Sequence, residues 1–134
     1  MYFAYGENEI SYLKSKDEKL AEVIEKIGMI ERETDTDLFS SVIHHIIGQQ
    51  ISTKAQATIW QRMQEGLGEV NAETILATDI SKLQSYGMTF RKAEYTTDFA
   101  EKVHNGTCNL DAVWQMSDEE ANRELRSLKG IGVW

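Results

Sequence analysis

The segment of residues 38–48 constrains the fold more than any other part of the sequence. Its large apolar side chains recur at helical spacing, yet they cover more than one face of the predicted helix. They are Leu38, Phe39, Val42, Ile43, Ile46 and Ile47. Because a helix that is apolar on several sides must be buried, we expect it to run through the core with other helices around it.

Two adjacent histidines, His44 and His45, interrupt this apolar segment. Neighbouring positions lie about 100° apart around a helix, so the two imidazoles cannot bind one metal ion together. No cysteine or carboxylate is spaced to complete a zinc site with either of them. We interpret both as hydrogen-bonded or solvent-facing side chains.

The rest of the sequence also predicts helices. The chain has no proline, and most of its nine glycines separate runs of helical periodicity. Helices are expected over residues 9–13, 17–27, 52–64, 71–77, 79–86, 90–104, 110–115 and 117–128. Asp35 or Thr36 can cap the central helix, and Trp60 is interpreted as a core residue. The fold class is therefore all-α, with residues 1–134 in one domain made of N-terminal helices (1–37) and a core (38–134).

The charge of the chain argues against strong binding to a polyanion. The formal net charge is −8, and non-specific affinity for DNA comes from lysine and arginine. The excess of acid is larger in residues 1–40, with 10 acidic and 5 basic side chains, than in residues 41–134, with 12 and 9. Arg91 and Lys92 stand in the first turn of a predicted helix, where the helix dipole disfavours cations. We interpret them as an ordinary surface pair or, alternatively, as phosphate contacts.

The composition and the N-terminal sequence indicate a cytoplasmic protein. The single cysteine, Cys108, cannot form an internal disulfide. The N-terminus lacks the basic start and apolar run of a signal peptide, and no later run of about 18 apolar residues could span a bilayer. We expect no membrane contact.

Two glycines, Gly130 and Gly132, flank the single aliphatic residue Ile131 directly after a predicted helix with a capping box at its start. A turn of this kind can adopt backbone angles closed to other residues while its amides stay uncovered. Uncovered amides at a helix N-terminus favour a phosphate. The alternative is a plain helix C-cap at Gly130 with nothing bound.

A second short break, residues 48–52, separates the central helix from the next one. Its sequence is Gly-Gln-Gln-Ile-Ser, and Ser52 is a favourable N-cap. It is either a simple polar turn or a rigid corner from which a glutamine enters a duplex. Glutamine suits the second role because its amide both donates and accepts hydrogen bonds.

Three segments together resemble the helix-hairpin-helix DNA glycosylase superfamily, in particular the alkyladenine (3-methyladenine DNA glycosylase II) type. They are FSSVIHHIIGQQIS at 39–52, GMTFRKAEY at 87–95 and LKGIG at 128–132. The three occur in the family's order, and the likeness runs from about residue 38 to residue 134. It implies a multi-helix glycosylase-type domain that ends within a helix-hairpin-helix motif.

The resemblance implies base excision DNA repair, in which the N-glycosidic bond of an alkylated base such as 3-methyladenine is hydrolysed in double-stranded DNA. By alignment, Gln50 fills the gap that the extruded base leaves, and Gly130, Ile131 and Gly132 contact the DNA. Trp134 would stack on the cationic alkylated base. Members that also cut the strand carry a Schiff-base lysine at this position, so tryptophan implies a glycosylase without lyase activity.

The resemblance implies no required cofactor, although the family's hairpin binds a monovalent cation that bridges to a phosphate. Carried across by the glycines, the ligands of Na⁺ or K⁺ would be the backbone carbonyls of Arg126, Leu128 and Ile131. The family's catalytic aspartate lies downstream of the hairpin, so we assign no catalytic residue here. We expect the chain to be the N-terminal portion of a longer glycosylase, inactive alone, and to self-associate through uncovered apolar surface.

Two other functions stay open at the level of sequence. One is a non-enzymatic helix-hairpin-helix module that binds DNA, although such a module has no use for a wedge at residues 48–50. The other is a helical interaction scaffold with no DNA role, which the net charge of −8 alone favours.

Overall fold

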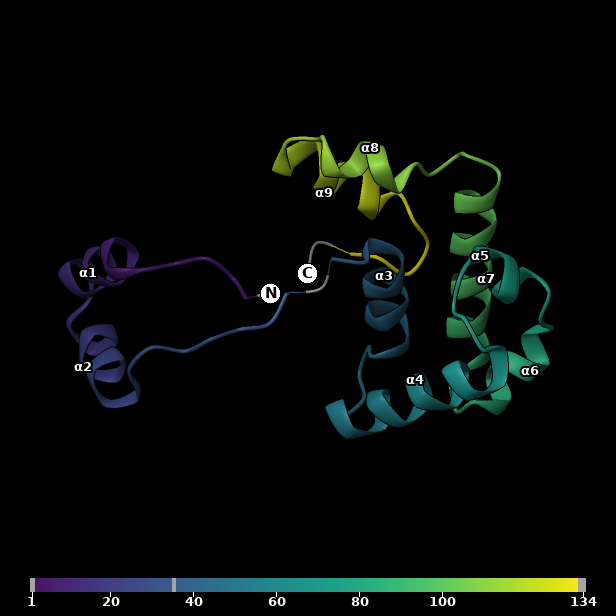
Figure 1. The fold of residues 1–134 in the computed structure, drawn as a ribbon, viewed down its shortest axis with the longest axis horizontal. Helices are drawn as coiled ribbons and strands as arrows, with labels where there is room; N and C mark the ends of the chain where they lie inside the picture. The colour runs from purple at the N-terminus through teal and green to yellow at the C-terminus, as the bar shows by residue number, and fades with distance from the viewer. Residues whose placement is uncertain (1, 35, 133–134) are drawn as a thin grey trace. The chain divides into compact units, whose positions relative to one another are not determined.

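The computed structural model describes residues 2–34 and 36–132, and these residues form helices and connecting turns without a strand. The chain divides into two compact units, Met1–Thr36 and Asp37–Trp134. The all-α fold class is confirmed (Figure 1). The single domain expected over residues 1–134 stays a prediction. Within the described ranges, no helix has the length and apolar character needed to cross a bilayer.

The first unit is a pair of helices, α1 (Glu7–Lys16) and α2 (Glu18–Ile27). Asp17 ends α1 and caps α2, because its carboxylate accepts hydrogen bonds from the amides of Lys19 and Leu20. The segments flanking the pair are joined to each other by the Tyr5 hydroxyl, which donates to the Ile30 carbonyl and accepts from the Ile30 amide. Neither helix of this unit contains a buried residue.

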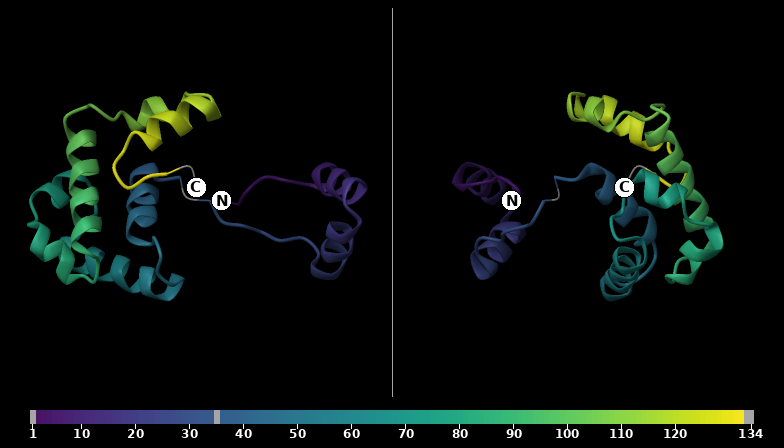
Figure 2. Two further views of the ribbon diagram at one scale, coloured as in Figure 1. Left: turned by 180° about the vertical axis from the view of Figure 1, so that it is seen from behind. Right: turned by 45° about the vertical axis from the view of Figure 1, so that its right-hand side comes forward.

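The second unit is built around α3 (Leu38–Ile47). The remaining helices are α4 (Thr53–Leu67), α5 (Ala72–Leu76), α6 (Ile80–Ser85), α7 (Phe90–His104), α8 (Leu110–Trp114) and α9 (Asp118–Arg126). Figures 1 and 2 show α3 beside the long helix α7, with α4 near one end of α3. In the view of Figure 1, the chain after α9 turns back between α3 and α7.

The apolar side chains of α3 form the centre of the core, as the sequence predicts. Ile43, Ile46 and Ile47 are fully buried, and Phe39 stacks on Phe99 of α7 with ring centroids 5.2 Å apart. Burying an isoleucine or phenylalanine side chain contributes about 1.5–3 kcal/mol. The core therefore fixes α3 against α7, and with it the turn at the C-terminal end of α3.

The helix ends are set by side-chain caps close to the predicted positions. Ser52 and Thr89 cap α4 and α7 through their hydroxyls, and a capping box opens α9 at Ser117. The cap expected for the central helix was wrong, because the helix begins at Leu38 and the residue directly before it is Asp37. Asp37 has an extended backbone and accepts from the Ser40 amide at 3.3 Å.

Trp60 packs at the edge of the core rather than inside it. The side chain is half-buried and meets His44 edge-on, with ring centroids 4.0 Å apart. The described residues contain no cluster of three or more histidine, cysteine or acidic side chains that could hold a metal ion.

Candidate nucleic-acid interface

The glycine turn after α9 is closed by a backbone hydrogen bond from the Ile131 amide to the Leu128 carbonyl, with N···O 3.2 Å. Gly130 occupies the third position of this turn with φ +85°, a conformation that residues with a side chain rarely adopt. A Cβ atom at Gly130 would also lie 2.5 Å from Cδ2 of Tyr95 on α7. Glycine at this position is therefore required twice, by the backbone angle and by packing.

Gly132 differs from Gly130 in both respects. Its φ lies outside the left-handed region, and a Cβ built there would meet no atom within 4 Å. Among hydrogen bonds between described residues, the amides of Gly130 and Gly132 have no acceptor. The fold therefore gives no reason for glycine at 132, and both amides are available to an anion.

The corner between α3 and α4 consists of residues 48–51, and its central residue has an unusual backbone. Gln50 has φ +58° and is the one non-glycine residue with positive φ in the described part of the chain. A left-handed backbone costs an L-residue roughly 1–2 kcal/mol. The Gln50 side chain is exposed. Strain at an exposed residue persists where the surrounding contacts fix the backbone on both sides.

Side chains from two other helices fix this corner at the C-terminal end of α3. The Gln56 amide of α4 donates to the His44 carbonyl at 2.7 Å. Lys92 of α7 donates to the carbonyls of Ile47 at 3.1 Å and Gln49 at 2.6 Å. Desolvation lowers the pKa of Lys92 below 10.5. The Lys92 ammonium satisfies the Ile47 carbonyl, which the end of the helix leaves without an intrahelical partner, whereas the His44 carbonyl also accepts the Gly48 amide at 2.9 Å.

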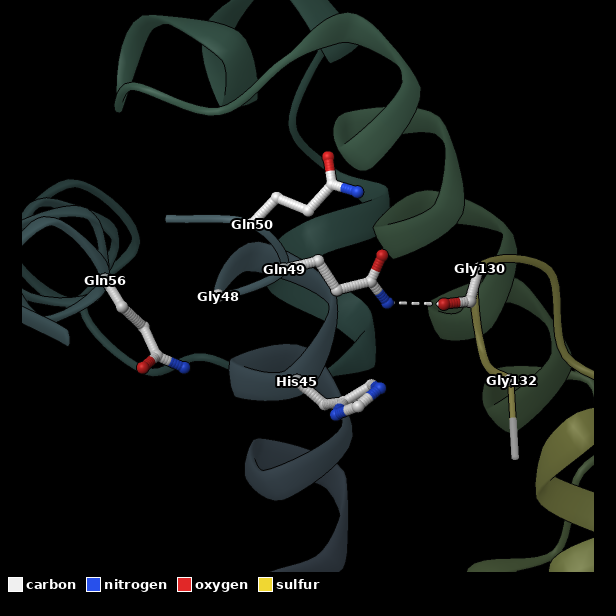
Figure 3. A pocket seen from close by; sticks show the side chains of 7 residues that line it. All are labelled: His45, Gly48, Gln49, Gln50, Gln56, Gly130 and Gly132. Carbon is white, nitrogen blue, oxygen red and sulfur yellow. Dashed lines mark hydrogen bonds between the residues drawn. The ribbon is translucent and has the colours of Figure 1, made fainter. Parts of the chain in front are cut away.

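The corner is also bonded directly to the glycine turn. The Gln49 side chain donates from Nε2 to the carbonyl oxygen of Gly130 at 2.5 Å, across 81 positions of sequence (Figure 3). This bond leaves the Gly130 amide unoccupied while fixing the position of its carbonyl. The two segments therefore form one connected surface.

A cavity of about 510 Å³ lies between the corner and the glycine turn. It is lined by His45, Gly48, Gln49, Gln50, Gln56, Gly130 and Gly132, and Figure 3 shows the His45 ring on the side of α3 that faces Gly132. Beside it, a second hollow of about 470 Å³ is lined by Gln49, Gln50, Ile51, Thr89, Arg91, Lys92, Tyr95 and Gly130. Gln50 borders both, so its side chain stands between two open spaces.

The structure brings several of the predicted site residues together. Gln50 is exposed and lines the same cavity as Gly130 and Gly132, as expected for a wedge and a phosphate-binding turn on one face. The side chain of Ile131 is partly buried and packs against the core. Trp134 lies outside the described residues.

The hydrogen bonds of the glycine turn show which of the three carbonyls predicted to bind a monovalent cation already have a partner. The Leu128 carbonyl accepts the Ile131 amide, and a carbonyl oxygen has a second lone pair. Between described residues, the Arg126 and Ile131 carbonyls accept no turn or loop hydrogen bond. Neutral carbonyl oxygens are ligands of a kind that suits Na⁺ or K⁺, and a cation site at these three residues stays a prediction.

Sequence reasoning missed four residues of this site: His45, Gln49, Gln56 and Lys92. His45 was interpreted as a hydrogen-bonded or solvent-facing side chain and not as a site residue, but it lines the same cavity as Gln49. Lys92 was assigned to the surface or to a phosphate, whereas it binds two carbonyls of the corner. Its unfavourable place at the N-terminus of α7 was the signal, because a cation there needs a partner elsewhere.

The cavity between corner and turn contains polar groups but no carboxylate. None of its seven described lining residues is aspartate or glutamate. The groups that face it are glutamine amides, an imidazole and backbone groups, which donate and accept hydrogen bonds. The arrangement can hold a polar or anionic ligand, and it supplies no acid or base from a carboxyl group.

Comparison with known proteins places this geometry in a family. Residues 43–132, more than half of the chain, match the model of the HhH-GPD superfamily of base excision DNA repair proteins. YfjP of Bacillus subtilis, provisionally named as a DNA-3-methyladenine glycosylase, is 30% identical in an alignment of 108 positions that covers 75% of this chain and 38% of that protein. The chain thus spans well under half the length of this curated relative.

Two solved structures share the fold. The crystal structure of a DNA-3-methyladenine glycosidase from Bacillus halodurans matches with a TM-score of 0.80 and 26% identity, over 100% of this chain and 63% of that one. The 3-methyladenine DNA glycosylase Mag1 of Schizosaccharomyces pombe, in complex with abasic DNA, matches with a TM-score of 0.79 and 23% identity, over 93% of this chain and 64% of that one. At 23% identity the likeness to Mag1 shows the fold alone.

Proposed function

Because this chain belongs to the HhH-GPD superfamily of base excision DNA repair proteins, we propose that it engages duplex DNA for a glycosylase reaction. The substrate class is an alkylated base such as 3-methyladenine, and the reaction is hydrolysis of its N-glycosidic bond without strand cleavage. The names of relatives that match this chain support the substrate class. A DNA substrate and a single cysteine suit a cytoplasmic location.

The observation that carries this proposal is the shared cavity of Gln50 and the glycine turn. A protein that extrudes a base must hold the backbone and fill the gap in the stack from one face of the duplex. Gln50, Gly130 and Gly132 line one cavity, and Gln49 bonds the two segments together. Their spacing is fixed by the fold, so both segments can act on the same nucleotide.

In this proposal Gln50 enters the duplex and its amide bonds to the base left without a partner. A glutamine amide presents both a donor and an acceptor, so it can pair with the edge of more than one base. Its exposed side chain and fixed backbone suit insertion, because little ordering is needed when the DNA binds.

The glycine turn holds a phosphate in the same proposal. The unoccupied amides of Gly130 and Gly132 point to an anion, and the open space at Gly132 lets a backbone approach closely. The carbonyls of Arg126, Leu128 and Ile131 would hold Na⁺ or K⁺. A bound cation would offset the phosphate charge, which matters in a chain with net charge −8.

We expect no base release by residues 1–134 alone. Cleavage of the bond develops positive charge on the sugar, which a nearby carboxylate stabilises. None of the described residues lining the cavity supplies one. Trp134 is expected to stack on the base and is part of the proposal only. We also expect self-association of this chain, which light scattering measures.

A second candidate function is a non-enzymatic module that binds DNA through the glycine turn. The missing carboxylate in the cavity favours it. Such a module would bind plain duplex and duplex with an abasic-site analogue equally, because it has no use for a residue that fills the stack.

The test of the proposed function measures binding of the chain to plain duplex and to duplex with an abasic-site analogue, by fluorescence anisotropy at low salt. For Gly132→Ala, we expect weaker binding to both duplexes with an unchanged fold, because the added methyl meets no protein atom. For Gln50→Ala, we expect the preference for the abasic analogue to fall by roughly twofold to tenfold, which is the contribution of about one hydrogen bond.

Gln64→Ala is the matched control, because Gln64 is an exposed glutamine on α4 that lies outside the lining of the cavity. It should bind both duplexes as the unsubstituted chain does. Equal binding of both duplexes by the unsubstituted chain would favour the non-enzymatic module. Base release from alkylated duplex by purified residues 1–134 would contradict the expected inactivity.

A further inference from the structure

Lys92 occupies a position at which the dipole of its own helix disfavours a positive charge. It lies in the first turn of α7, next to the positive end of the helix dipole. Its ammonium reaches instead to the end of α3, where it lies 3.1 Å from the Ile47 carbonyl oxygen and 2.6 Å from that of Gln49. Ile47 is the last residue of α3, so the cation meets the negative end of another helix.

The two carbonyls lie on either side of Gly48 and lead directly to Gln50. Carbonyls at the end of a helix have no partner within it, and an ammonium donor satisfies them with charge-assisted hydrogen bonds. Gln49 is thereby held at two points, its carbonyl by Lys92 and its side chain by Gly130. The residue that follows Gln49 is the strained Gln50.

We propose that Lys92 is a positioning residue for Gln50, holding the corner in the one conformation in which the glutamine side chain projects beside the glycine turn. This inference rests on the proposed function, since the position matters only if Gln50 enters a duplex. Lys92 then acts through the protein backbone and touches no DNA.

A direct phosphate contact is the competing role for this lysine. An ammonium has three N–H donors, and two of them are occupied by Ile47 and Gln49. Arg91, next to it, is exposed and lines the hollow beside Gln50, so it is the freer cation for a phosphate. The two roles differ in salt dependence, because each phosphate contact contributes about 0.9 to the slope of log affinity against log salt.

The experiment uses Lys92→Met, which keeps an unbranched side chain as far as the ε position and removes the ammonium donors. Lys82→Met, on the exposed surface of α6, removes the same charge elsewhere. The probes are a plain duplex and a duplex with an abasic-site analogue opposite 2-aminopurine, whose fluorescence reports the stacking of the orphaned base. Binding is measured at several salt concentrations.

We expect the preference for the abasic duplex to fall by roughly threefold to tenfold in Lys92→Met. Without the ammonium, the corner has to be ordered when the DNA binds, and this ordering costs binding free energy. The 2-aminopurine signal at saturation should fall, while the salt slope should equal that of Lys82→Met. A slope reduced by about 0.9 with an unchanged 2-aminopurine signal would overturn the positioning role in favour of a phosphate contact.

Chemical restoration of the ammonium provides a second test of the positioning role, and it does not depend on the folding of Lys92→Met. Alkylation of the folded Lys92→Cys variant with 2-bromoethylamine rebuilds an ammonium at the same reach. The natural Cys108 is 3% exposed, so the reagent acts at the new thiol, and the treated unsubstituted chain is the control. We expect alkylation to restore the 2-aminopurine signal, and no gain on alkylation would overturn the inference.

The outcomes separate this inference from the proposed function. If the unsubstituted chain gives no 2-aminopurine response at saturation, the proposed function fails, and the positioning role fails with it. If the unsubstituted chain responds and Lys92→Met responds equally, the positioning role alone is overturned.

Discussion

The corner of residues 48–51 and the glycine turn of residues 128–132 border the same cavity but reach their shapes by different means. The glycine turn is closed by a local backbone hydrogen bond, and its left-handed position is occupied by Gly130. The corner places a glutamine in the left-handed region and is held by side chains from α4 and α7. One shape follows from local sequence and the other from distant contacts.

The difference has a functional reason in the proposed role. Glycine makes a left-handed backbone inexpensive, but it carries no side chain. A turn that binds phosphate through amides needs only the backbone, whereas a corner that fills a base stack needs a side chain at its most projecting position. The strain at Gln50 is then offset by the hydrogen bonds of Gln56 and Lys92 to the neighbouring carbonyls.

The largest effect is expected for Gly130→Ala, which tests the local origin of the glycine turn. The added Cβ combines a left-handed backbone with a contact of 2.5 Å to the Tyr95 ring. We expect the free energy of unfolding to fall by about 3 kcal/mol. Urea unfolding followed by tryptophan fluorescence measures this unit, because all three tryptophans of the chain follow residue 37.

Gly106→Ala is the matched control for the backbone angle alone. Gly106 has φ +82° with nothing within 4 Å of a built Cβ, so its substitution should cost about 1–2 kcal/mol. Adding Tyr95→Leu to Gly130→Ala should recover part of the loss. Equal losses for Gly130→Ala and Gly106→Ala would show that Tyr95 imposes no restriction on the turn.

A smaller effect of opposite sign is expected for Gln50→Gly, which tests the strain in the corner. Glycine relieves a left-handed backbone cost of about 1–2 kcal/mol and adds roughly 0.5–1 kcal/mol of unfolded-state entropy. The free energy of unfolding should therefore rise by up to about 1.5 kcal/mol, while the preference for abasic duplex is lost. A decrease in stability would mean that the Gln50 side chain contributes contacts that offset the strain.

The sequence predicted most of the fold because its signals are local. The α7 bounds follow from Thr89 and from the periodicity over residues 90–104, and the central helix was identified from its apolar side chains. The cap of that helix was placed one or two residues early, since Asp35, Thr36 and Asp37 are all plausible caps by composition and helix boundaries read from sequence are uncertain by one or two residues.

The candidate site could be predicted in part, and here too the local features were visible in the sequence while the long-range contacts were not. The break at residues 48–52 and the Gly-x-Gly turn are local features that the sequence shows directly, and the resemblance to the family then selected Gln50 within the break. The bonds that join the two segments could not be predicted, because Gln49 meets Gly130 across 81 positions and Lys92 meets Ile47 across 45. Nothing in the neighbourhood of a glutamine or lysine in sequence indicates which distant carbonyl it will bind.

The smallest expected effect on the free energy of unfolding comes from the titration of Lys92. It tests whether a desolvated ammonium holds the corner. Burial lowers the pKa of Lys92 from the ordinary 10.5 by removing water from the charged form. The unfolded chain then binds this proton more tightly than the folded chain does. The free energy of unfolding should therefore rise with pH between the lowered pKa and 10.5.

Two measurements check this prediction. The Lys92 Cε chemical shift, followed by NMR against pH, should give a midpoint below 10.5, and Lys92→Met should remove the corresponding rise in stability. Lys82→Met should leave that rise in place, because Lys82 is exposed on α6. A neutral lysine still has two N–H donors, so the corner should keep its shape above the midpoint. A Lys92 midpoint at or above 10.5 would mean that the two carbonyls stabilise the charge by more than its desolvation costs.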